Sequence, residues 1–340
     1  MVHDNEISII IQGPVHDHFV EELLAQTRNC FQNSQIIYST WIGNNTNLIP
    51  SDVIVVQNTD PGGTPISDNP IAYDSANRQI ISTISGLRRA NRKYSIKMRS
   101  DILFEHNNWL KMFNHYQKYD HDYKFLRSRV LISSMFCVNP NKIPLPYHPS
   151  DWFFFGLTAD LIDIFDVPLL TEENANWFKG KIRNEFSYGW HCRYRSEQHI
   201  WTSFIKKHHQ LNFDHQNDID NNNIEISERI FANNTLILDP HILGMKSLKH
   251  PNYIGDDFNK GYFSSNYYFH DWLKLYKNYS DRDAKYCYFN YRRWRTTLLW
   301  GLKNKTDSIH LLFLYNGLLK YPFIKKLKRF LKSLRNPPAL

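Results

Sequence analysis

The chain has 340 residues and a mass of 40.6 kDa, which is enough for one large α/β domain or for two smaller domains. Its composition, 42% hydrophobic and 22% charged, excludes a wholly disordered protein. No uncharged apolar run reaches the ~18 residues that a conventional membrane-spanning helix needs. The four cysteines lie far apart without a CxxC pair, which argues against a zinc site and against a disulfide framework.

The net charge of +8 is concentrated near the C-terminus. Seven Lys and Arg residues and no acidic residue occur from position 308 to position 340, which leaves a formal charge of +1 for the first 307 residues. A nucleic-acid-binding protein more often spreads its basic surface over the folded domain, so we expect no nucleic-acid partner. The first six residues are polar and acidic and lack the apolar segment of a signal peptide, so we expect a cytoplasmic protein.

The first 100 residues predict alternating strands and helices. A β-branched run at 7–11 predicts a strand that is buried on both faces and ends at Gln12-Gly13-Pro14. The further elements predicted in this part are strands over 35–41, 52–56 and 94–98 and helices over 19–30 and 71–90. Strands that alternate with helices predict a parallel sheet with right-handed crossovers.

The pattern after residue 100 is less regular. Ser196 as the N-cap and Glu197 in the first turn begin a predicted helix over 196–207. An Asn- and Asp-rich stretch at 216–223 predicts a loop. The remaining predicted elements are strands over 126–134, 151–156 and 235–238 and a helix over 158–165. The whole pattern predicts an α/β fold.

Polar residues follow the predicted strands, where a parallel α/β sheet binds its ligands. They are Gln12, Gly13, Thr40, Asp60 and Asp101. The helix over 71–90 also carries Arg78. If Arg78 and Asp101 meet at one edge, a guanidinium and a carboxylate-bound metal would stabilise the charge that develops on a departing nucleoside diphosphate. Each residue also has a plain structural interpretation, since Asp101 could cap a turn and Arg78 could be a solvated helix residue.

Seven short segments between residues 7 and 201 carry a resemblance to known proteins. They are Ile9-Ile10-Ile11-Gln12-Gly13-Pro14, Ser39-Thr40-Trp41, Asp60-Pro61-Gly62, Asn77-Arg78-Gln79, Lys97-Met98-Arg99-Ser100-Asp101, Asp151-Trp152-Phe153-Phe154-Phe155-Gly156 and Ser196-Glu197-Gln198-His199-Ile200-Trp201. In their order and spacing the chain resembles the WavE family of lipopolysaccharide-core synthesis proteins and, more broadly, the GT-A glycosyltransferases. The resemblance implies a GT-A-like, Rossmann-type fold with a mixed, mainly parallel sheet flanked by helices.

The resemblance also implies a set of donor-binding residues. They are Gln12, Gly13, Pro14, Asp60, Asn77, Arg78, Arg99 and Asp101. In this set Gln12, Gly13 and Pro14 would line the base and ribose, although Gly13-Pro14 could equally be a plain strand-ending turn. Asp60 would accept a hydrogen bond from the base or a ribose hydroxyl, and Arg78 would reach the diphosphate. Asp101 would hold Mn²⁺ or Mg²⁺, which prefer oxygen ligands.

One departure from the family pattern concerns the metal. The usual Asp-x-Asp reads Arg99-Ser100-Asp101 here, so Arg99 could partly replace the metal's charge. In GT-A enzymes a downstream histidine can complete the metal shell, and His241 is the first candidate and His250 the second. A lone histidine is more often structural.

Two carboxylates are candidates for the general base that an inverting sugar transfer needs. Glu197 comes first, because the N-terminal end of a helix should keep its carboxylate ionised. Asp151 comes second, because it precedes an aromatic strand that could stack on sugar rings. Either residue could instead serve only to cap its own element.

The C-terminal stretch predicts a basic amphipathic helix over 318–336. Its apolar residues recur at helical spacing, and Lys and Arg occupy the other faces. Such a helix docks on an anionic bilayer, or it packs on the body of the protein with a solvated basic face. We therefore expect three regions: a GT-A-like domain over 1–250 with nucleotide and acceptor halves at about 1–105 and 106–250, an aromatic-rich helical region over 251–317, and the helical extension.

These features favour a glycosyltransferase that uses a nucleotide-sugar donor and a lipid-linked glycan acceptor, bound peripherally to the inner face of the cell membrane. Two alternatives stay open. A sugar nucleotidyltransferase would share the sheet and the metal-binding carboxylate, but it would act on nucleoside triphosphates. A catalytically silent scaffold would use the same cleft to bind a sugar or nucleotide and recruit other enzymes to the membrane.

Overall fold

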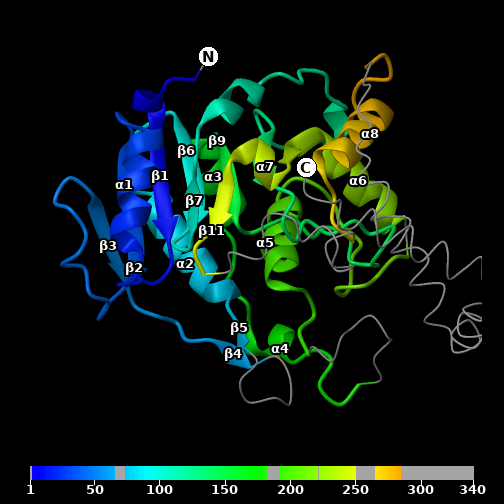
Figure 1. Ribbon diagram of the computed structural model, residues 1–340. Helices are drawn as coiled ribbons and strands as arrows, with labels where there is room; N and C mark the ends of the chain where they lie inside the picture. The colour runs from blue at the N-terminus through cyan, green and yellow to red at the C-terminus, as the bar shows by residue number, and fades with distance from the viewer. Residues whose placement is uncertain (1, 66–72, 182–190, 221, 250–264, 285–340) are drawn as a thin grey trace, which may run out of the picture. The chain divides into compact units, whose positions relative to one another are not determined.

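The computed structural model describes residues 2–65, 73–181, 191–220, 222–249 and 265–284, all of which belong to one compact unit (Figure 1). Seven strands in these ranges form a central sheet in the order β10-β8-β9-β6-β1-β2-β3. They are β1 (Ile7–Gln12), β2 (Gln35–Trp41), β3 (Ile54–Asn58), β6 (Tyr94–Arg99), β8 (Val130–Ser133), β9 (Phe153–Leu157) and β10 (Thr235–Leu238). Neighbouring strands are parallel except in the two pairs that β9 makes.

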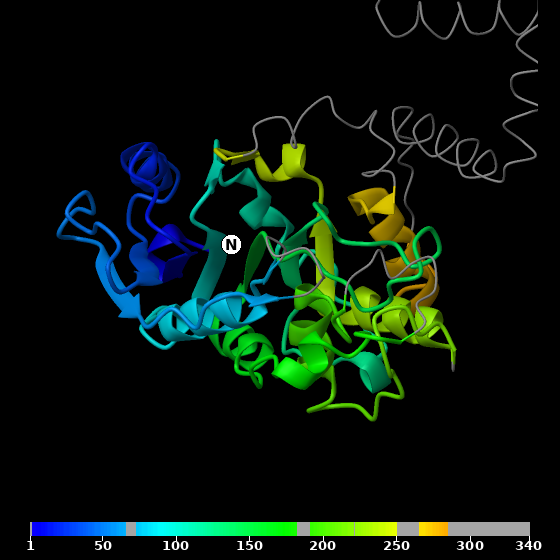
Figure 2. The ribbon, with the colours of Figure 1, turned by 90° about the horizontal axis from the view of Figure 1, so that it is seen from below.

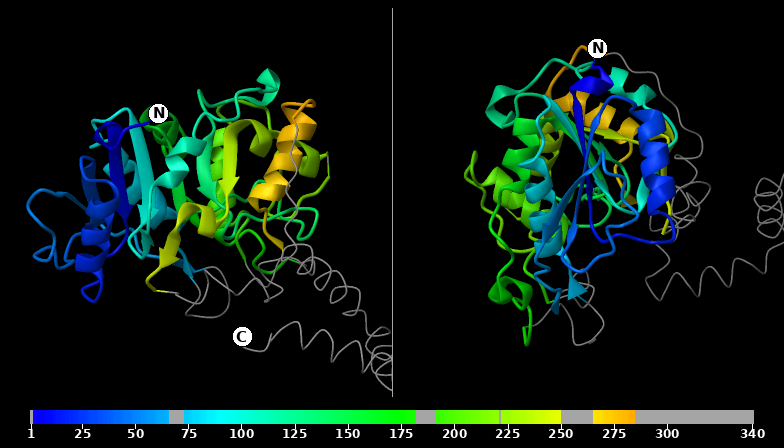
Figure 3. Two further views of the ribbon diagram at one scale, coloured as in Figure 1. Left: turned by 45° about the horizontal axis from the view of Figure 1, so that its top comes forward. Right: turned by 90° about the vertical axis from the view of Figure 1, so that its left-hand side faces the viewer.

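Helices cover both faces of this sheet (Figures 2 and 3). One face carries α2 (Ala76–Leu87), α3 (Thr158–Phe165) and α5 (Ser196–Ile205), and α1 (Val20–Cys30) lies on the other. Every residue of β1 is buried, as its β-branched run predicts for a strand covered on both sides. Gly86 lets α2 approach β1 closely, because a Cβ at this position would lie 2.5 Å from Cγ2 of Ile10.

A two-stranded antiparallel ribbon lies on the same side of the sheet as α1. It consists of β7 (Ile102–Phe104) and β11 (Met245–Ser247), and β11 follows the short helix α7 (Pro240–Leu243). The remaining short elements are β4 (Thr64–Pro65), β5 (Tyr73–Asp74), α4 (Glu172–Ala175) and the 3₁₀ helices η1 (Asp4–Glu6), η2 (Asn108–Met112) and η3 (His121–Tyr123). In this ribbon the segment directly after β6 is hydrogen-bonded to the segment at 245–247.

At the β10 end of the sheet, α6 (Asn223–Asn234) and α8 (Phe269–Tyr279) pack against each other and against β10. Helix α8 is the described part of the aromatic-rich region predicted over 251–317, and it belongs to the same compact unit as the sheet. The rest of that region and the basic helix predicted over 318–336 lie outside the described residues. None of the helices within the described ranges is long and apolar enough to cross a bilayer.

The predicted fold class is confirmed: the sheet is mixed and mainly parallel, helices flank it, and the arrangement is consistent with a GT-A-like fold. Some boundaries differ from the prediction. The third strand begins at Ile54 instead of residue 52, because Val53 closes a turn onto the carbonyl of Pro50 at 3.0 Å. Helix α2 begins only at Ala76, whose backbone N–H donates to the Asp74 carboxylate at 2.6 Å. The loop predicted over 216–223 ends where α6 begins, a helix that the sequence did not predict.

Candidate functional site

The carboxyl ends of β1, β2 and β6 meet at one edge of the sheet, and the amino end of β9 joins them. Because β9 runs antiparallel to β6, Phe153 pairs with Met98, and the residues before β9 lie beside those after β6. The backbone N–H of Arg99 donates to the carbonyl of Trp152 at 3.3 Å. The edge therefore gathers Gln12 to Pro14, Arg99 to Asp101, and Asp151, which the sequence placed in three separate motifs.

A cleft of about 300 Å³ opens at this edge. Its lining residues are Gln12, Gly13, Pro14, His16, Trp41, Ser75, Arg78, Gln79, Arg99, Ser100, Asp101, Asp151 and Lys249. The volume lies at the lower end of the range for small-molecule pockets. Arg78 and Asp101 both line the cleft, so the guanidinium and the carboxylate that the sequence analysis singled out share one edge of the sheet.

The turn after β1 forms one wall of the cleft. Gly13 has a φ of +127°, which favours glycine, and its backbone N–H donates to Ser39 at 3.1 Å. The backbone carbonyl of Gln12 accepts from the backbone N–H of Ser100 at 2.9 Å. The side-chain oxygen of Gln12 accepts from the hydroxyl of Ser82 at 2.8 Å. These bonds fix the turn rigidly against the end of β6.

Arg99 organises the charges of the opposite wall. Its Nε and Nη2 donate to the two oxygens of Asp101 at 2.9 and 2.8 Å, its Nη1 lies 3.8 Å from Oδ2 of Asp151, and its guanidinium stacks 4.9 Å from the Trp152 ring. Although burial opposes the charged forms, this pairing raises the pKa of Arg99 and lowers the pKa of Asp101. The pair is therefore a fixed, ionised unit inside the cleft.

Arg78 is held by Asp60 at the outer part of the cleft. Its Nε and Nη2 donate to the two carboxylate oxygens of Asp60 at 2.7 and 2.8 Å. These hydrogen bonds lower the pKa of Asp60. Asp60 itself is not among the lining residues, so its direct role in the structure is to orient Arg78. Asn77 also does not line the cleft, because its side-chain amide bonds the backbone of Leu170 in both directions.

The two candidate bases occupy different positions. Asp151 lines the cleft and accepts a hydrogen bond from Gln79 at 2.6 Å. Glu197 lines a small adjoining pocket that Asp151 and Gln79 also border, and its Oε2 lies 3.6 Å from Nε2 of His148. Only Asp151 therefore faces the cleft described above.

The surroundings of Glu197 oppose the expected ionisation. The residue lies in the first turn of α5, as predicted, but burial and the nearby charge of Asp151 raise its pKa. Burial also lowers the pKa of His148 to about 4, so its imidazole is neutral at pH 7 and supplies no compensating cation. Desolvation and the charge of Asp151 thus act against the dipole of the helix end, and Glu197 keeps its proton to a higher pH than an ordinary glutamate.

Lys97 supports Asp151 from within the sheet. Its side chain is fully buried on β6, and Nζ donates to the backbone carbonyl of Asp151. The ammonium also lies 5.9 and 5.6 Å from the ring centres of Phe154 and Phe165. Burial lowers the pKa of Lys97 to about 8. A buried lysine at this point fixes the backbone of the segment that carries Asp151.

The described residues fit a divalent metal poorly. Both oxygens of Asp101 already accept hydrogen bonds from Arg99, and no three His, Cys, Asp or Glu residues in the described ranges lie close enough to share an ion. His241 lies on α7 and is not among the lining residues, while His250 lies outside the described residues.

Six lining residues were not predicted as site candidates: His16, Trp41, Ser75, Gln79, Ser100 and Lys249. Trp41 ends β2, so the rule that ligands bind at strand ends would have found it. His16 follows the turn after β1, and burial lowers its pKa. Lys249 depends on the pairing of β7 with β11, for which the sequence gives no local signal.

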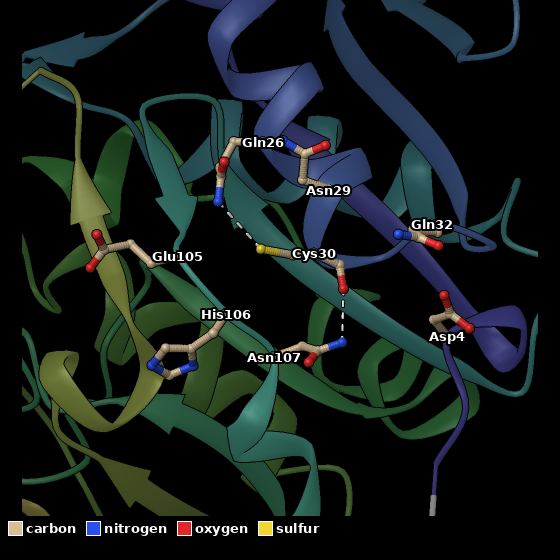
Figure 4. Close-up of a pocket in the computed structure, with 8 residues that line it drawn as sticks. All are labelled: Asp4, Gln26, Asn29, Cys30, Gln32, Glu105, His106 and Asn107. Carbon is tan, nitrogen blue, oxygen red and sulfur yellow. Dashed lines mark hydrogen bonds between the residues drawn. The ribbon is translucent and has the colours of Figure 1, made fainter.

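A second pocket, of about 370 Å³, lies between α1 and the segment after β7 (Figure 4). Its central contacts tie these two segments together. Gln26 donates to the carbonyl of Phe104 at 2.9 Å, and Asn107 donates to the carbonyl of Cys30 at 2.7 Å. These contacts anchor the β7 ribbon to α1 and give the pocket a structural role.

Comparison with known proteins identifies the family of this chain. The chain belongs to the WavE lipopolysaccharide synthesis family, whose family model matches residues 7–304. The match includes the three strand ends, the segment before β9 and the start of α5. No curated protein matches the chain. Membership of this family connects the chain with the synthesis of lipopolysaccharide.

Proposed function

We propose that this chain is a glycosyltransferase that moves a sugar from a nucleotide-sugar donor to a glycan or glycolipid acceptor. The observation that carries the proposal is the cleft at the carboxyl edge of the sheet, where Arg78 and Arg99 accompany the carboxylates Asp101 and Asp151. Guanidinium groups suit a diphosphate leaving group, and a carboxylate suits the activation of a sugar hydroxyl. Membership of a lipopolysaccharide synthesis family supports the same class of reaction.

In this proposal the donor enters with its diphosphate between the two arginines. The bond between the sugar's anomeric carbon and the diphosphate oxygen breaks, and the electron pair leaves with the diphosphate. Nη1 of Arg99, which lies 3.8 Å from Asp151, and the guanidinium of Arg78 stabilise the growing negative charge. Trp41, only 7% exposed, offers an apolar wall for the donor's base.

Asp151 is the general base of the proposed reaction. It lines the cleft, whereas Glu197 lies in the adjoining pocket and has a raised pKa. Asp151 would take the proton of the acceptor hydroxyl as its oxygen attacks the anomeric carbon. Gln79 and Lys97 hold Asp151 in place through its carboxylate and its backbone carbonyl.

The acceptor in this proposal is a lipid-linked glycan of the lipopolysaccharide core or a related surface polysaccharide. The support comes from the family and from the basic amphipathic stretch at 318–336, which lies outside the described residues. Such a stretch would bring the enzyme to the anionic inner face of the cell membrane.

A two-stage experiment tests the proposed activity. Thermal unfolding with a panel of nucleotide sugars identifies the donor, because a ligand that binds only the folded state raises the melting temperature. Sugar transfer or donor hydrolysis is then measured for the native chain, for Asp101→Asn, and for Asp166→Asn as a control that alters a surface pair with Arg88. We expect turnover that is lost only in Asp101→Asn. Binding without turnover would indicate a silent scaffold, and action on nucleoside triphosphates would indicate a nucleotidyltransferase.

A further inference from the structure

Lys249 reaches the cleft through the β7–β11 ribbon. In this ribbon Ser247 pairs with Ile102, and the backbone N–H of Leu248 donates to the carbonyl of Asp101 at 2.8 Å. The next residue is therefore held beside the Arg99-Ser100-Asp101 turn, and its side chain lines the cleft. Backbone hydrogen bonds thus fix the chain as far as Leu248, and Lys249 follows directly after it.

The ribbon is anchored from its other side. Gln26 and Cys30 of α1 both donate to the carbonyl of Phe104, at 2.9 and 3.2 Å. The turn before β11 packs closely against His106, because a Cβ on Gly244 would lie 2.8 Å from Nε2 of His106. Gly244 also has a φ of +60°, which favours glycine. The sheet, α1 and the ribbon therefore form one support for the cationic side of the cleft.

The cations of the cleft differ in what they already bind. Arg99 is occupied by Asp101, and Arg78 is occupied by Asp60. Lys249 is exposed and makes no hydrogen bond or ion pair with any residue that the structure describes, although its charge acts on Asp101 and on His16. Its three N–H donors are thus available to an anion in the cleft.

The same charges oppose a divalent cation. To bind Asp101, a metal ion would have to displace the two hydrogen bonds from Arg99, and it would be repelled by that guanidinium and by the ammonium of Lys249, whose charge acts on Asp101. An anionic diphosphate meets the opposite situation, because both cations attract it and Nη1 of Arg99 is not engaged in a hydrogen bond within the described residues. The cleft is therefore built for a phosphate group without an intervening ion.

We propose that Lys249 and Arg99 bind the diphosphate of the donor directly, and that this binding requires no divalent metal. The inference rests on the proposed function for the identity of the ligand, but the binding itself can be measured without any sugar transfer. As the leaving diphosphate gains negative charge, the ammonium of Lys249 stabilises it in the way that a metal ion would. Lys249 and Arg99 thus stabilise the leaving diphosphate without a metal ion.

The test uses the full-length protein and inorganic pyrophosphate as the probe, with titration calorimetry in the presence of EDTA and again with Mn²⁺. Lys249→Met removes the charge and keeps much of the side-chain length, and Lys249→Arg restores a cation. Lys246→Met is the matched control, because Lys246 lies on the same ribbon but points to Glu105, with Nζ 2.5 Å from its carboxylate. Thermal unfolding of each variant confirms that it is folded.

We expect pyrophosphate to bind in EDTA, Lys249→Met to weaken this binding roughly tenfold or more, and Lys249→Arg and Lys246→Met to stay within about threefold of the native chain. Binding that requires Mn²⁺, or equal affinity of the native chain and Lys249→Met, would overturn the proposal. If pyrophosphate binds through Lys249 but no nucleotide sugar is turned over, the proposed glycosyltransferase function fails and the anion site stands.

Discussion

Gly13 lies so close to Ser100 that a side chain at position 13 would force the Ser100 hydroxyl to move. A Cβ on Gly13 would come 2.7 Å from Oγ of Ser100, and the backbone at Gly13 has a φ of +127°. The hydrogen bond from Ser100 to the carbonyl of Gln12 requires this approach. The wall of the cleft therefore depends on a glycine at this position for two independent reasons.

Gly13→Ala should destabilise the protein and disturb the cleft. The strained φ and the contact with Ser100 together should lower the free energy of unfolding by roughly 2 kcal/mol or more. Gly43→Ala is the control, because Gly43 has a φ of +90° but nothing within 4 Å of the added Cβ, so only the backbone strain of about 1 kcal/mol applies. Denaturant unfolding measures both. Equal losses for the two variants would show that the contact with Ser100 costs nothing.

Asp60→Asn should strengthen the binding of a diphosphate. The pair of Asp60 with Arg78 is more than a third exposed on both sides, so its loss should cost less than about 1 kcal/mol of stability. The substitution frees Arg78 and removes a negative charge near the cleft, so we expect pyrophosphate to bind roughly threefold more tightly. Calorimetry measures the change.

Asp52→Asn provides the control for this experiment, since Asp52 pairs with Arg28 at the same 2.7 Å but lies away from the cleft. The family resemblance instead implies a direct contact of Asp60 with the donor's base or ribose. If that role is correct, Asp60→Asn will weaken the binding of a nucleoside diphosphate and leave pyrophosphate unchanged.

The sheet and much of its functional edge could be predicted because their signals are local. The apolar runs of β1 and β6 identify buried strands by themselves, and parallel strands necessarily place the residues at their carboxyl ends on one edge. Gln12 and Asp101 were found in this way. Asp151 was found only as the start of an aromatic strand, because its place in the cleft follows from the antiparallel direction of β9, which no local pattern reveals.

Contacts between distant segments set the limit of prediction. Lys249 enters the cleft because β11 pairs with β7, and these strands, at 245–247 and 102–104, lie far apart in the sequence. Glu197 was placed correctly at the start of a helix, but its charge state depends on burial beneath residues from several other segments. Asn77 was predicted to bind the donor, but its side-chain amide is hydrogen-bonded to the backbone of Leu170, a residue far along the chain.

Deletion of residues 323–340 tests the predicted membrane-binding helix. Six Lys and Arg residues in this stretch, each worth about 1 kcal/mol near an anionic surface, should be enough for reversible docking at low salt. We expect the shortened chain to lose binding to vesicles rich in anionic lipid and to keep activity on a soluble acceptor. Co-sedimentation at two salt concentrations measures the binding. Binding that survives the deletion would place the membrane contact elsewhere.

Asp151→Asn and Glu197→Gln separate the two candidate bases. If Asp151 accepts the acceptor's proton, Asp151→Asn should lower kcat by about 10² to 10⁴ with little change in donor affinity. Glu197→Gln should lower kcat less than about fivefold at pH 7, because the raised pKa of Glu197 favours the protonated acid, which glutamine resembles. Steady-state kinetics with the identified donor decides between them. The reverse order of effects would assign the base to Glu197.

The raised pKa of Glu197 predicts a specific dependence of stability on pH. The pKa lies at about 8 in the folded chain against 4.5 for the unfolded reference, so the unfolded chain releases this proton first as the pH rises. The contribution of the protonated Glu197 carboxyl to the free energy of unfolding is complete below the unfolded pKa. It is lost as the pH approaches 8, at up to about 1.4 kcal/mol per pH unit. Glu197→Gln removes this loss.

The measurement compares the free energy of unfolding of the native chain and of Glu197→Gln at several pH values between 4.5 and 8.5. We expect the variant to gain stability relative to the native chain as the pH rises through this window. Lys97 and His148, whose pKa values are also shifted by burial, are present in both proteins, so their own titrations largely cancel in the difference. A difference that stays constant with pH would show that Glu197 ionises normally, and it would return this residue to the role of candidate base.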